Sequence, residues 1–228
     1  MTSNLCFIGD VHSQYDKLQN AVDYAETQNL RIIFLGDLFD SRCKYSDSIN
    51  VFNLVYDCIR NGHLCVNSNH QDKLIRHLKG NQVLLNNGLD ITVNEFIDSN
   101  FDKNHLLEFL TSLPYGIVCK NSFGKEFRIA HAYFPNSIEI PEYDDFYFVY
   151  GNEISRKTKK NMIYGPLDQE RKRVLWWENS RVDQNFIRVS GHYHKVYVDN
   201  YSVVIDSGCG SGGCLSLYNA DTGCIKEF

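Results

Sequence analysis

Five groups of Asp, Asn and His residues each follow an apolar run of the sequence. Asp10 and His12 follow the first run, and Asp37 and Asp40 follow the second. Because alternate residues of an extended chain point the same way, Asp10 and His12 can bind one ion. The remaining groups are Asn67-Ser68-Asn69-His70, His131 and Gly191-His192-Tyr193-His194. Carboxylate, amide and imidazole donors together make the ligand set of a mixed nitrogen and oxygen metal site.

These groups can act together only if the runs before them are neighbouring strands. Leu5–Gly9 and Arg31–Gly36 are predicted strands with a helix-periodic stretch between them, which is a β-α-β pattern. The other groups follow the strand-like runs His63–Val66, Phe127–Ala130 and Ile187–Ser190. Loops at the carboxyl ends of neighbouring strands in an open α/β sheet converge on one crevice. Five such strand ends predict a dinuclear metal site, since a protein core avoids buried charges that lack partners.

The remaining sequence alternates in the same way and then becomes rich in short strands. Helices are predicted from a cap at Ser46 or Asp47 through Asn61, over Gln71–Lys79, and over Asp102–Leu113. Further strands are predicted at Ile117–Cys119, Tyr197–Val198, Val203–Ser207, Leu215–Asn219 and Cys224–Phe228. Because no internal repeat or linker interrupts the chain, we expect residues 1–228 to form a single mixed α/β domain.

The composition excludes several classes of protein. Hydrophobic residues make up 43% and charged residues 22% of the 228 residues, which excludes a disordered chain, a coiled coil and a fibre. No apolar run approaches the ~18 residues of a membrane span, and the start lacks the pattern of a signal peptide. We therefore expect a soluble cytoplasmic protein with no membrane partner. The net charge of −5 argues against a constitutive nucleic-acid coat protein, and eight cysteines without a C-x2-C pair predict reduced thiols.

The segment Gly151–Arg173 differs from the rest of this acidic chain. It carries a local excess of positive charge, formed by Arg156, Lys157, Lys159, Lys160, Arg171, Lys172 and Arg173. Its composition alone is typical of a solvated surface loop.

Taken in order, the five groups resemble the motifs of the calcineurin-like metallophosphoesterases. Those motifs are Gly-Asp-x-His, Gly-Asp-x-x-Asp-Arg, Gly-Asn-His, a His after a strand, and Gly-His-x-His, and the resemblance spans nearly the whole chain. The run Leu64–Arg76 and the stretch Ile205–Cys209 are most similar to the phosphatase module of bacterial polynucleotide kinase-phosphatases. Bacterial and phage Ser/Thr protein phosphatases and diadenosine tetraphosphatases are also similar. The resemblance implies an α/β fold in which two mixed β-sheets form a sandwich flanked by helices.

The resemblance also implies a role for each matching residue. Two divalent metal ions are expected, with manganese first and iron, zinc or nickel as alternatives. His70 would protonate the leaving oxygen and Asp40 would orient it, while Arg42 and Arg181 would bind phosphate. The implied metal ligands are Asp10, His12 and His194 for one ion, Asn69, His131 and His192 for the other, and Asp37 as the bridge.

Three positions depart from the motifs. Ser68 stands where the family has Gly, Gln71 stands where it has an acidic residue, and Ser41 moves the arginine of the second motif to Arg42. The long side chain of Arg42 can still reach a phosphate, although the bidentate geometry then has to form from a different position.

The expected function is hydrolysis of phosphomonoesters by attack of a metal-bridging hydroxide. The substrate would be a phosphorylated Ser or Thr of a protein, a nucleotide, or a phosphate at a nucleic-acid end. Because His194 gives the last motif a second His, as in phosphodiesterase branches of the family, cyclic nucleotides and dinucleoside polyphosphates are alternative substrates. An alternative of another class is a binding module that keeps the fold and has little catalytic activity. The oligomeric state is not predicted.

Overall fold

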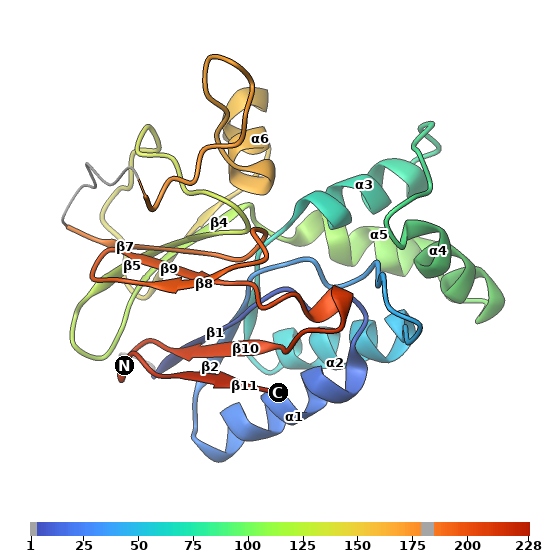
Figure 1. Ribbon diagram of the computed structural model, residues 1–228, viewed down its shortest axis with the longest axis horizontal. Coiled ribbons are helices and arrows are strands. Elements are labelled where there is room, and N and C mark those ends of the chain that lie inside the picture. The colour runs from blue at the N-terminus through green and yellow to red at the C-terminus, as the bar shows by residue number, and fades with distance from the viewer. Residues whose placement is uncertain (1–3, 179–184) are drawn as a thin grey trace.

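The computed structural model describes residues 4–178 and 185–228, and Figure 1 shows two β-sheets stacked between helices. Within the described residues, the first sheet has the strand order β11-β10-β1-β2-β3 and the second β6-β4-β5-β7-β9-β8. The strands of the first sheet are β1 (Leu5–Ile8), β2 (Arg31–Phe34), β3 (Leu64–Cys65), β10 (Ser216–Asn219) and β11 (Ile225–Glu227). Those of the second are β4 (Gly116–Lys120), β5 (Glu126–Ala130), β6 (Phe146–Val149), β7 (Ile187–Ser190), β8 (Val196–Val198) and β9 (Ser202–Ile205). The expected two-sheet sandwich is confirmed.

Strand β1 is apolar throughout because both of its faces are buried. Leu5 and Phe7 point into the space between the sheets, where they pack with residues of the second sheet such as Phe127. Cys6 and Ile8 point the other way, into the layer of helices. A strand that alternates between two apolar layers reads in sequence as a continuous hydrophobic run.

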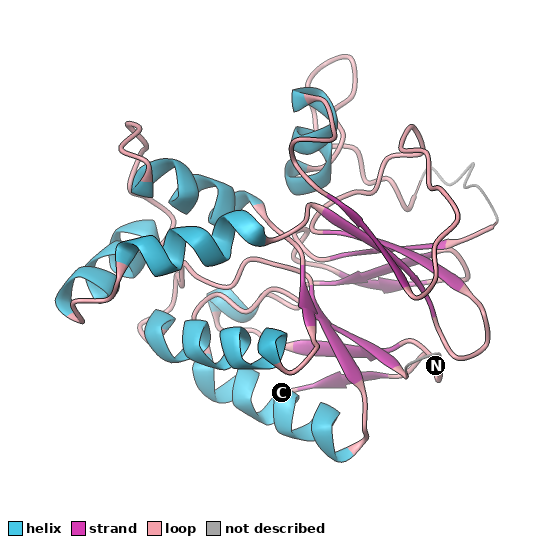
Figure 2. Cartoon of the chain, turned by 180° about the vertical axis from the view of Figure 1, so that it is seen from behind, coloured by secondary structure: helices cyan, strands magenta, loops and turns pink. Residues whose placement is uncertain are grey.

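Helices cover the outer face of each sheet. Helices α1 (Tyr15–Thr27) and α2 (Ser48–Arg60) lie against the first sheet, and α6 (Arg156–Tyr164) lies over the second (Figure 1). The helices α3 (Asn69–Leu78), α4 (Leu89–Asp98) and α5 (Lys103–Ser112) pack together beside the sandwich, as Figure 2 shows from behind. A short 3-10 helix, η1 (Cys209–Ser211), precedes β10. Within the described residues, no helix combines the length and the apolar character that a membrane crossing would need.

Strand direction brings the chemically important loops together. β1, β2 and β3 are mutually parallel, and so are β5, β7 and β9 in the other sheet. The convergence expected from the residues alone is that of an open sheet with one row of strand ends. The structure instead has two rows, one from each sheet, and the site forms where they meet.

Three elements differ from the sequence-based expectation. Helix α4 and strand β6 were not expected, and residues Arg156–Tyr164, expected within a surface loop, form helix α6. Ser155 caps α6 by accepting a hydrogen bond from Thr158 N at 3.1 Å, and Met162 and Ile163 are buried beneath it. The loop interpretation of that part was therefore wrong, because two apolar residues and a cap outweigh the run of charges.

Candidate metal centre

Each expected group of ligands lies just beyond a strand of one of the two sheets. Asp10 follows β1 and Asp37 follows β2, while Asn69 and His70 begin α3 just after β3. From the second sheet, His131 follows β5 and His192 follows β7. The carboxylates thus come from one sheet and two of the imidazoles from the other.

The carboxylate of Asp37 lies at the centre of this arrangement. Its Oδ2 is 3.3 Å from His131 Nε2 and 3.6 Å from His12 Nε2. The ligating atoms of Asp37, His131 and His192 all lie within 4.8 Å of one another, and the same is true of Asp37, His12 and His70. Because Asp37 belongs to both clusters, it has the position of a bridging ligand between two ions.

Hydrogen bonds fix the orientation of two histidine rings near Asp37. His131 Nδ1 donates to Leu35 O at 2.8 Å, which leaves the lone pair of Nε2 facing Asp37 and Asn69 Oδ1, the latter at 2.8 Å. His12 Nδ1 donates to the carbonyl oxygens of Phe39 and Asp40, so its Nε2 also faces Asp37. Second hydrogen bonds of this kind fix the tautomer of ligating histidines in proteins.

The electrostatics of the buried residues are those of a site built for positive charge. Burial opposes ionisation of Asp37, but the neighbouring His131 and His70 hold the pKa of this carboxyl well below its usual range. Burial, followed by the charge of His131, holds the pKa of His192 well below that of an ordinary histidine. A carboxylate and a neutral imidazole are the protonation states that bind a divalent cation.

The surroundings of Asp10 also fit a cation. Burial and the charges of Asp206 and Asp37 raise the pKa of Asp10 well above its usual range. Among the described residues, Asp10 Oδ1 is buried without a hydrogen-bond partner, although Oδ2 accepts from the backbone N of His192 at 2.9 Å. Buried carboxylates in contact are costly unless a cation neutralises them, so the residues present fit the metal ions that the sequence implies.

His70 and Asp40 form a pair at the edge of the centre. His70 Nδ1 donates to Asp40 Oδ2 at 2.6 Å, and its Nε2 faces Asp37 Oδ2 at 3.9 Å. Burial lowers the pKa of His70, but the charge of Asp37 and the hydrogen bond to Asp40 outweigh it and raise the pKa overall. Asp40 is held in turn by the hydrogen bond from its backbone N to Thr92 Oγ1 at 3.0 Å.

The backbone is strained at these residues. His12, Asp37, Asp40, His192 and His194 all have positive φ angles between 44° and 71°. Non-glycine residues rarely adopt this conformation, and clusters of it mark functional sites. Three of these residues, His12, Asp37 and His192, also belong to the clusters of potential ligands.

Three expected site residues lie differently from the others. His194 is exposed and, like Asp10, lies outside both ligand clusters, and its backbone N donates to Asp206 Oδ2 at 2.6 Å. Arg42 is exposed beside His70, whose protonation its positive charge opposes. Arg181 lies outside the described residues.

The departures from the family motifs have local structural roles. Ser68 caps helix α3, where its Oγ accepts from Gln71 N at 3.3 Å and also contacts Gln71 Oε1. A Ser followed three residues later by Gln is the sequence pattern of a capping box, although here the backbone N of Ser68 donates to Asn67 Oδ1 and Gln71 contacts only the Ser68 hydroxyl. The two departures thus contact each other at the start of the helix that carries Asn69. Ser41 is fully buried and its Oγ donates to Tyr45 O at 2.8 Å, which shapes the loop after Asp40.

Two residues near the centre were not singled out from the sequence. Asp206 follows β9 directly, and its two oxygens accept from the backbone N of His194 and of Gly208. Asp10 and Asp37 were predicted because each is an acidic residue that follows an apolar run. Asp206 has the same pattern and could have been predicted in the same way. The other residue is Arg173, whose positive charge lowers the pKa of His192. In the sequence, Arg173 is one of seven basic residues of the same segment, and nothing distinguishes it from the other six.

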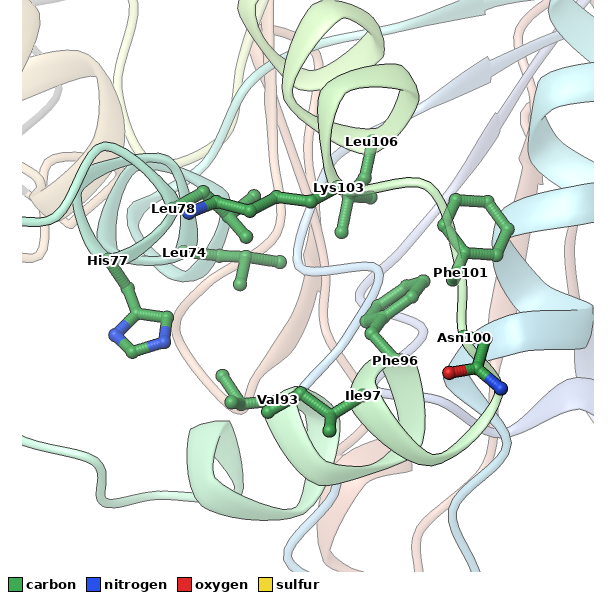
Figure 3. A pocket seen from close by; sticks show the side chains of 10 residues that line it. All are labelled: Leu74, His77, Leu78, Val93, Phe96, Ile97, Asn100, Phe101, Lys103 and Leu106. Carbon is green, nitrogen blue, oxygen red and sulfur yellow. The ribbon is translucent and has the colours of Figure 1, made fainter.

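A separate cavity of about 420 Å³ lies among helices α3, α4 and α5 (Figure 3). None of the expected site residues that the structure describes lines it. Its lining is Leu74, His77, Leu78, Val93, Phe96, Ile97, Asn100, Phe101, Lys103 and Leu106.

The model of the calcineurin-like phosphoesterase family matches residues 3–211. The chain belongs to this family. It is a metal-dependent phosphoric ester hydrolase, as expected from the sequence.

Curated relatives extend the similarity over nearly the whole calcineurin-like chain. The asymmetrical bis(5′-nucleosyl)-tetraphosphatase PrpE of Oceanobacillus iheyensis is 27% identical over 97% of this chain and 89% of its own length. The protein of the same name from Bacillus velezensis is 27% identical over 92% of this chain and 86% of its own length.

Solved structures share the fold. A protein described as a candidate diadenosine tetraphosphatase has a TM-score of 0.64 at 18% identity, and covers 100% of this chain and 94% of its own. A serine/threonine phosphatase from Saccharomyces cerevisiae has a TM-score of 0.51 at 13% identity, with 100% of this chain and 80% of that one covered.

Proposed function

We propose that this calcineurin-like phosphoesterase hydrolyses dinucleoside polyphosphates with two metal ions bridged by Asp37. The observation that carries the hydrolytic part is the position of Asp37 in both ligand clusters, beside the His70–Asp40 pair. Two clusters with a common carboxylate are what a dinuclear site for in-line displacement at phosphorus requires.

We assign the metal ligands as the sequence motifs imply. Asp10, His12 and His194 would hold one ion, and Asn69, His131 and His192 the other. When bound, the two cations would neutralise charge on the phosphoryl oxygens and lower the pKa of a water molecule. Manganese remains our prediction for both ions.

The His70–Asp40 pair supports a role in proton transfer. Because Nδ1 of His70 is bonded to Asp40, the proton available for donation is on Nε2, which faces the centre. Hydrolysis forms one bond from a water oxygen to phosphorus and breaks the bond to the leaving oxygen. His70 then gives its Nε2 proton to that leaving oxygen, and water supplies the proton that restores it.

Similarity in sequence supports the dinucleoside polyphosphate as the substrate. The relatives that match nearly all of this chain are named as bis(5′-nucleosyl)-tetraphosphatases, which agrees with one alternative of the sequence analysis. Phosphomonoesters on proteins or nucleic-acid ends, the first expectation, stay a prediction. The similarity to a protein phosphatase structure concerns the fold alone.

A substrate panel with the purified, manganese-loaded protein tests the proposal. Diadenosine tetraphosphate, a phosphopeptide, an RNA with a 3′-phosphate, a 2′,3′-cyclic nucleotide and nitrophenyl phosphate would be compared by kcat/KM. We expect the highest value for diadenosine tetraphosphate, with ATP and AMP as products by chromatography. A higher kcat/KM for the phosphopeptide or the RNA would replace the proposed substrate class.

The variant Asp37→Asn tests the metal centre itself. Because the bridging carboxylate contributes charge to both ions, we expect metal content and turnover to fall together. Metal content would be measured by mass spectrometry of the protein, alongside the rate. If Asp37→Asn kept two ions and near-normal turnover, the assignment of Asp37 would be contradicted. If the wild-type protein bound two metal ions but hydrolysed none of the substrates, a binding module would be favoured.

A further inference from the structure

Arg173 belongs to a hairpin that follows helix α6. Val174 N donates to Pro166 O at 2.9 Å, and Asp168 N donates to Lys172 O at 2.9 Å. Leu167 and Arg173 pair as an antiparallel bridge within it. Residues 166–174, which we call the α6 hairpin, are thus a hydrogen-bonded unit.

Two buried tryptophans anchor the end of the α6 hairpin to the metal centre. Trp176 Nε1 donates to Ala132 O at 3.0 Å, one residue after the ligand His131. The ring of Trp177 meets the ring of Tyr193 edge-on at 4.7 Å between centroids, one residue after the ligand His192. These contacts fix the hairpin against both loops that supply imidazoles from the second sheet.

The guanidinium of Arg173 therefore lies at a defined position beside the centre. Its Cζ is 5.6 Å from the centroid of the Tyr193 ring, and the Tyr193 ring is 5.2 Å from that of His192. Arg173 is exposed, and no carboxylate in residues 4–178 or 185–228 forms an ion pair with it.

Arg42 and Arg173 approach different sides of the metal centre. Arg42 lies two residues after Asp40, whose carboxylate accepts from His70, whereas Arg173 lies over the Tyr193 ring, which meets the His192 ring edge-on. Between them lie the contacts of His70 with Asp37 at 3.9 Å, Asp37 with His131 at 3.3 Å, and His131 with His192 at 3.0 Å. A single phosphate bound over Asp37 needs no cation on the His192 side beyond the metal, but a chain of phosphates extends past it.

We infer that Arg173 binds a second, non-scissile phosphate and so makes the enzyme selective for substrates with a phosphate chain. The inference rests on the proposed function, because it names a further contact of the same substrate. Arginine suits this role because its planar fork bonds phosphate oxygens in a bidentate manner. The contact would lower KM for a polyphosphate and leave a monoester unaffected.

The test compares Arg173→Gln with the neighbouring control Lys172→Gln in the manganese-loaded full chain. Lys172 pairs with Glu170 at 2.6 Å in an exposed position, so its loss removes the same charge away from the centre. For diadenosine tetraphosphate we expect Arg173→Gln to raise KM roughly tenfold or more, the range of a lost charged hydrogen bond, and the inhibition constant of the product ATP should rise by a similar factor. For nitrophenyl phosphate, we expect kcat and KM to stay near the wild-type values.

Further arms separate a direct contact from other roles. Arg173→Lys should restore part of the affinity, and the effect of Arg173→Gln should persist at 0.5 M salt, where distant steering is screened. An equal KM change in Lys172→Gln would overturn the inference, and so would an equal loss of kcat on nitrophenyl phosphate. An effect on diadenosine tetraphosphate but not on ATP would mean that Arg173 contacts the second nucleoside rather than the phosphate chain. Because the wild-type rates are measured alongside, failure of the proposed function is seen separately.

Discussion

At the scale of the single residue, the position of His70 agrees with the general-acid role that we propose for it. It lies at the edge of the centre, and its Nδ1 is bonded to Asp40 so that Nε2 faces Asp37. We expect His70→Ala to keep both metal ions and to lose roughly 10²–10⁴-fold in turnover on an alkyl phosphate. An aryl phosphate or a polyphosphate should suffer less, since its leaving oxygen needs little protonation. Equal losses on all of these substrates would mean that His70 only shapes the site.

Most of the residues brought together at the centre could be predicted from the sequence. Asp10, Asp37 and His131 each follow an apolar run, and the order of the motifs supplied the rest through resemblance to the family. The local roles of Ser68 and Gln71 could not be predicted with the same reasoning. They were noted as departures from a motif, whereas their mutual hydrogen bonding depends on the start of α3.

At the scale of elements, Gly88 connects the unexpected helix α4 to the His70–Asp40 pair. It precedes α4 with a φ of +91°, and a Cβ at this position would clash with Ser41 O and lie 2.5 Å from the carbonyl carbon of Asp40. These are backbone atoms, so they cannot move aside as a flexible side chain would. Helix α4 therefore packs directly on the turn that holds Asp40.

We expect Gly88→Ala to lower both stability and turnover. The control is Gly80→Ala, because Gly80 has a φ of +81° but nothing within 4 Å of an added Cβ. Gly80→Ala should cost about 1 kcal/mol for the left-handed backbone alone, and Gly88→Ala a further ~1–3 kcal/mol for the clash. Denaturant unfolding measures both free energies. If the two variants lost the same free energy of unfolding and Gly88→Ala kept its turnover, α4 would have no role in holding the site.

The exposed lysines of helix α6 allow a test of electrostatic steering. Lys159 is already used, since its Nζ pairs with Asp72 at 2.9 Å and lies over the Tyr115 ring. Lys157 and Lys160 are exposed, so the double variant Lys157→Gln/Lys160→Gln is the appropriate change. At low salt we expect a lower kcat/KM for a phosphorylated oligonucleotide and no change for nitrophenyl phosphate, with the difference fading near 0.15 M as the Debye length falls to ~8 Å. If kcat/KM for the oligonucleotide did not change, the lysines of α6 would have no role in attracting the substrate.

The elements missed from the sequence are those decided by packing. Ile91, Thr92 and Val93 are β-branched and favour a strand, yet α4 forms because Val93 and Phe96 bury a helical face in the core. Strand β6 begins with the aromatic pair Phe146 and Tyr147, but it becomes a strand only through its antiparallel pairing with β4. Neither partner is adjacent in sequence, so local propensity does not reveal them.

At the scale of the whole molecule, the metal centre joins the two sheets. Asp37 follows a strand of the first sheet and His131 follows a strand of the second, so ions bound between them would hold the sandwich together. We expect manganese at about 100 times its Kd to stabilise the fold by about 2.7 kcal/mol, or about 5–10 °C in Tm. Calorimetry with and without a chelator measures this shift, and Asp37→Asn should lose most of it. An identical Tm in chelator and in manganese would contradict metal binding between the sheets.

We propose that residues 1–228 fold as a single domain, as expected from the sequence. Both sheets contribute to one apolar layer, in which Phe7 of β1 contacts Phe127 of β5 at 5.3 Å between ring centroids. The same calorimetric scans should therefore give one cooperative transition.

The placement of β10 has a consequence for how the protein is made. β10 pairs with β1, and Ser216 O accepts the hydrogen bond of Gly9 N at 3.0 Å, directly before Asp10. Proteins are synthesised from the N-terminus at about 5–20 residues per second, so β1 leaves the ribosome on the order of ten seconds or more before its partner. During that interval one edge of β1 is open to pairing with other chains. A message that stops translation before residue 216 would therefore yield a chain that cannot complete the turn at Asp10 and that aggregates through this edge.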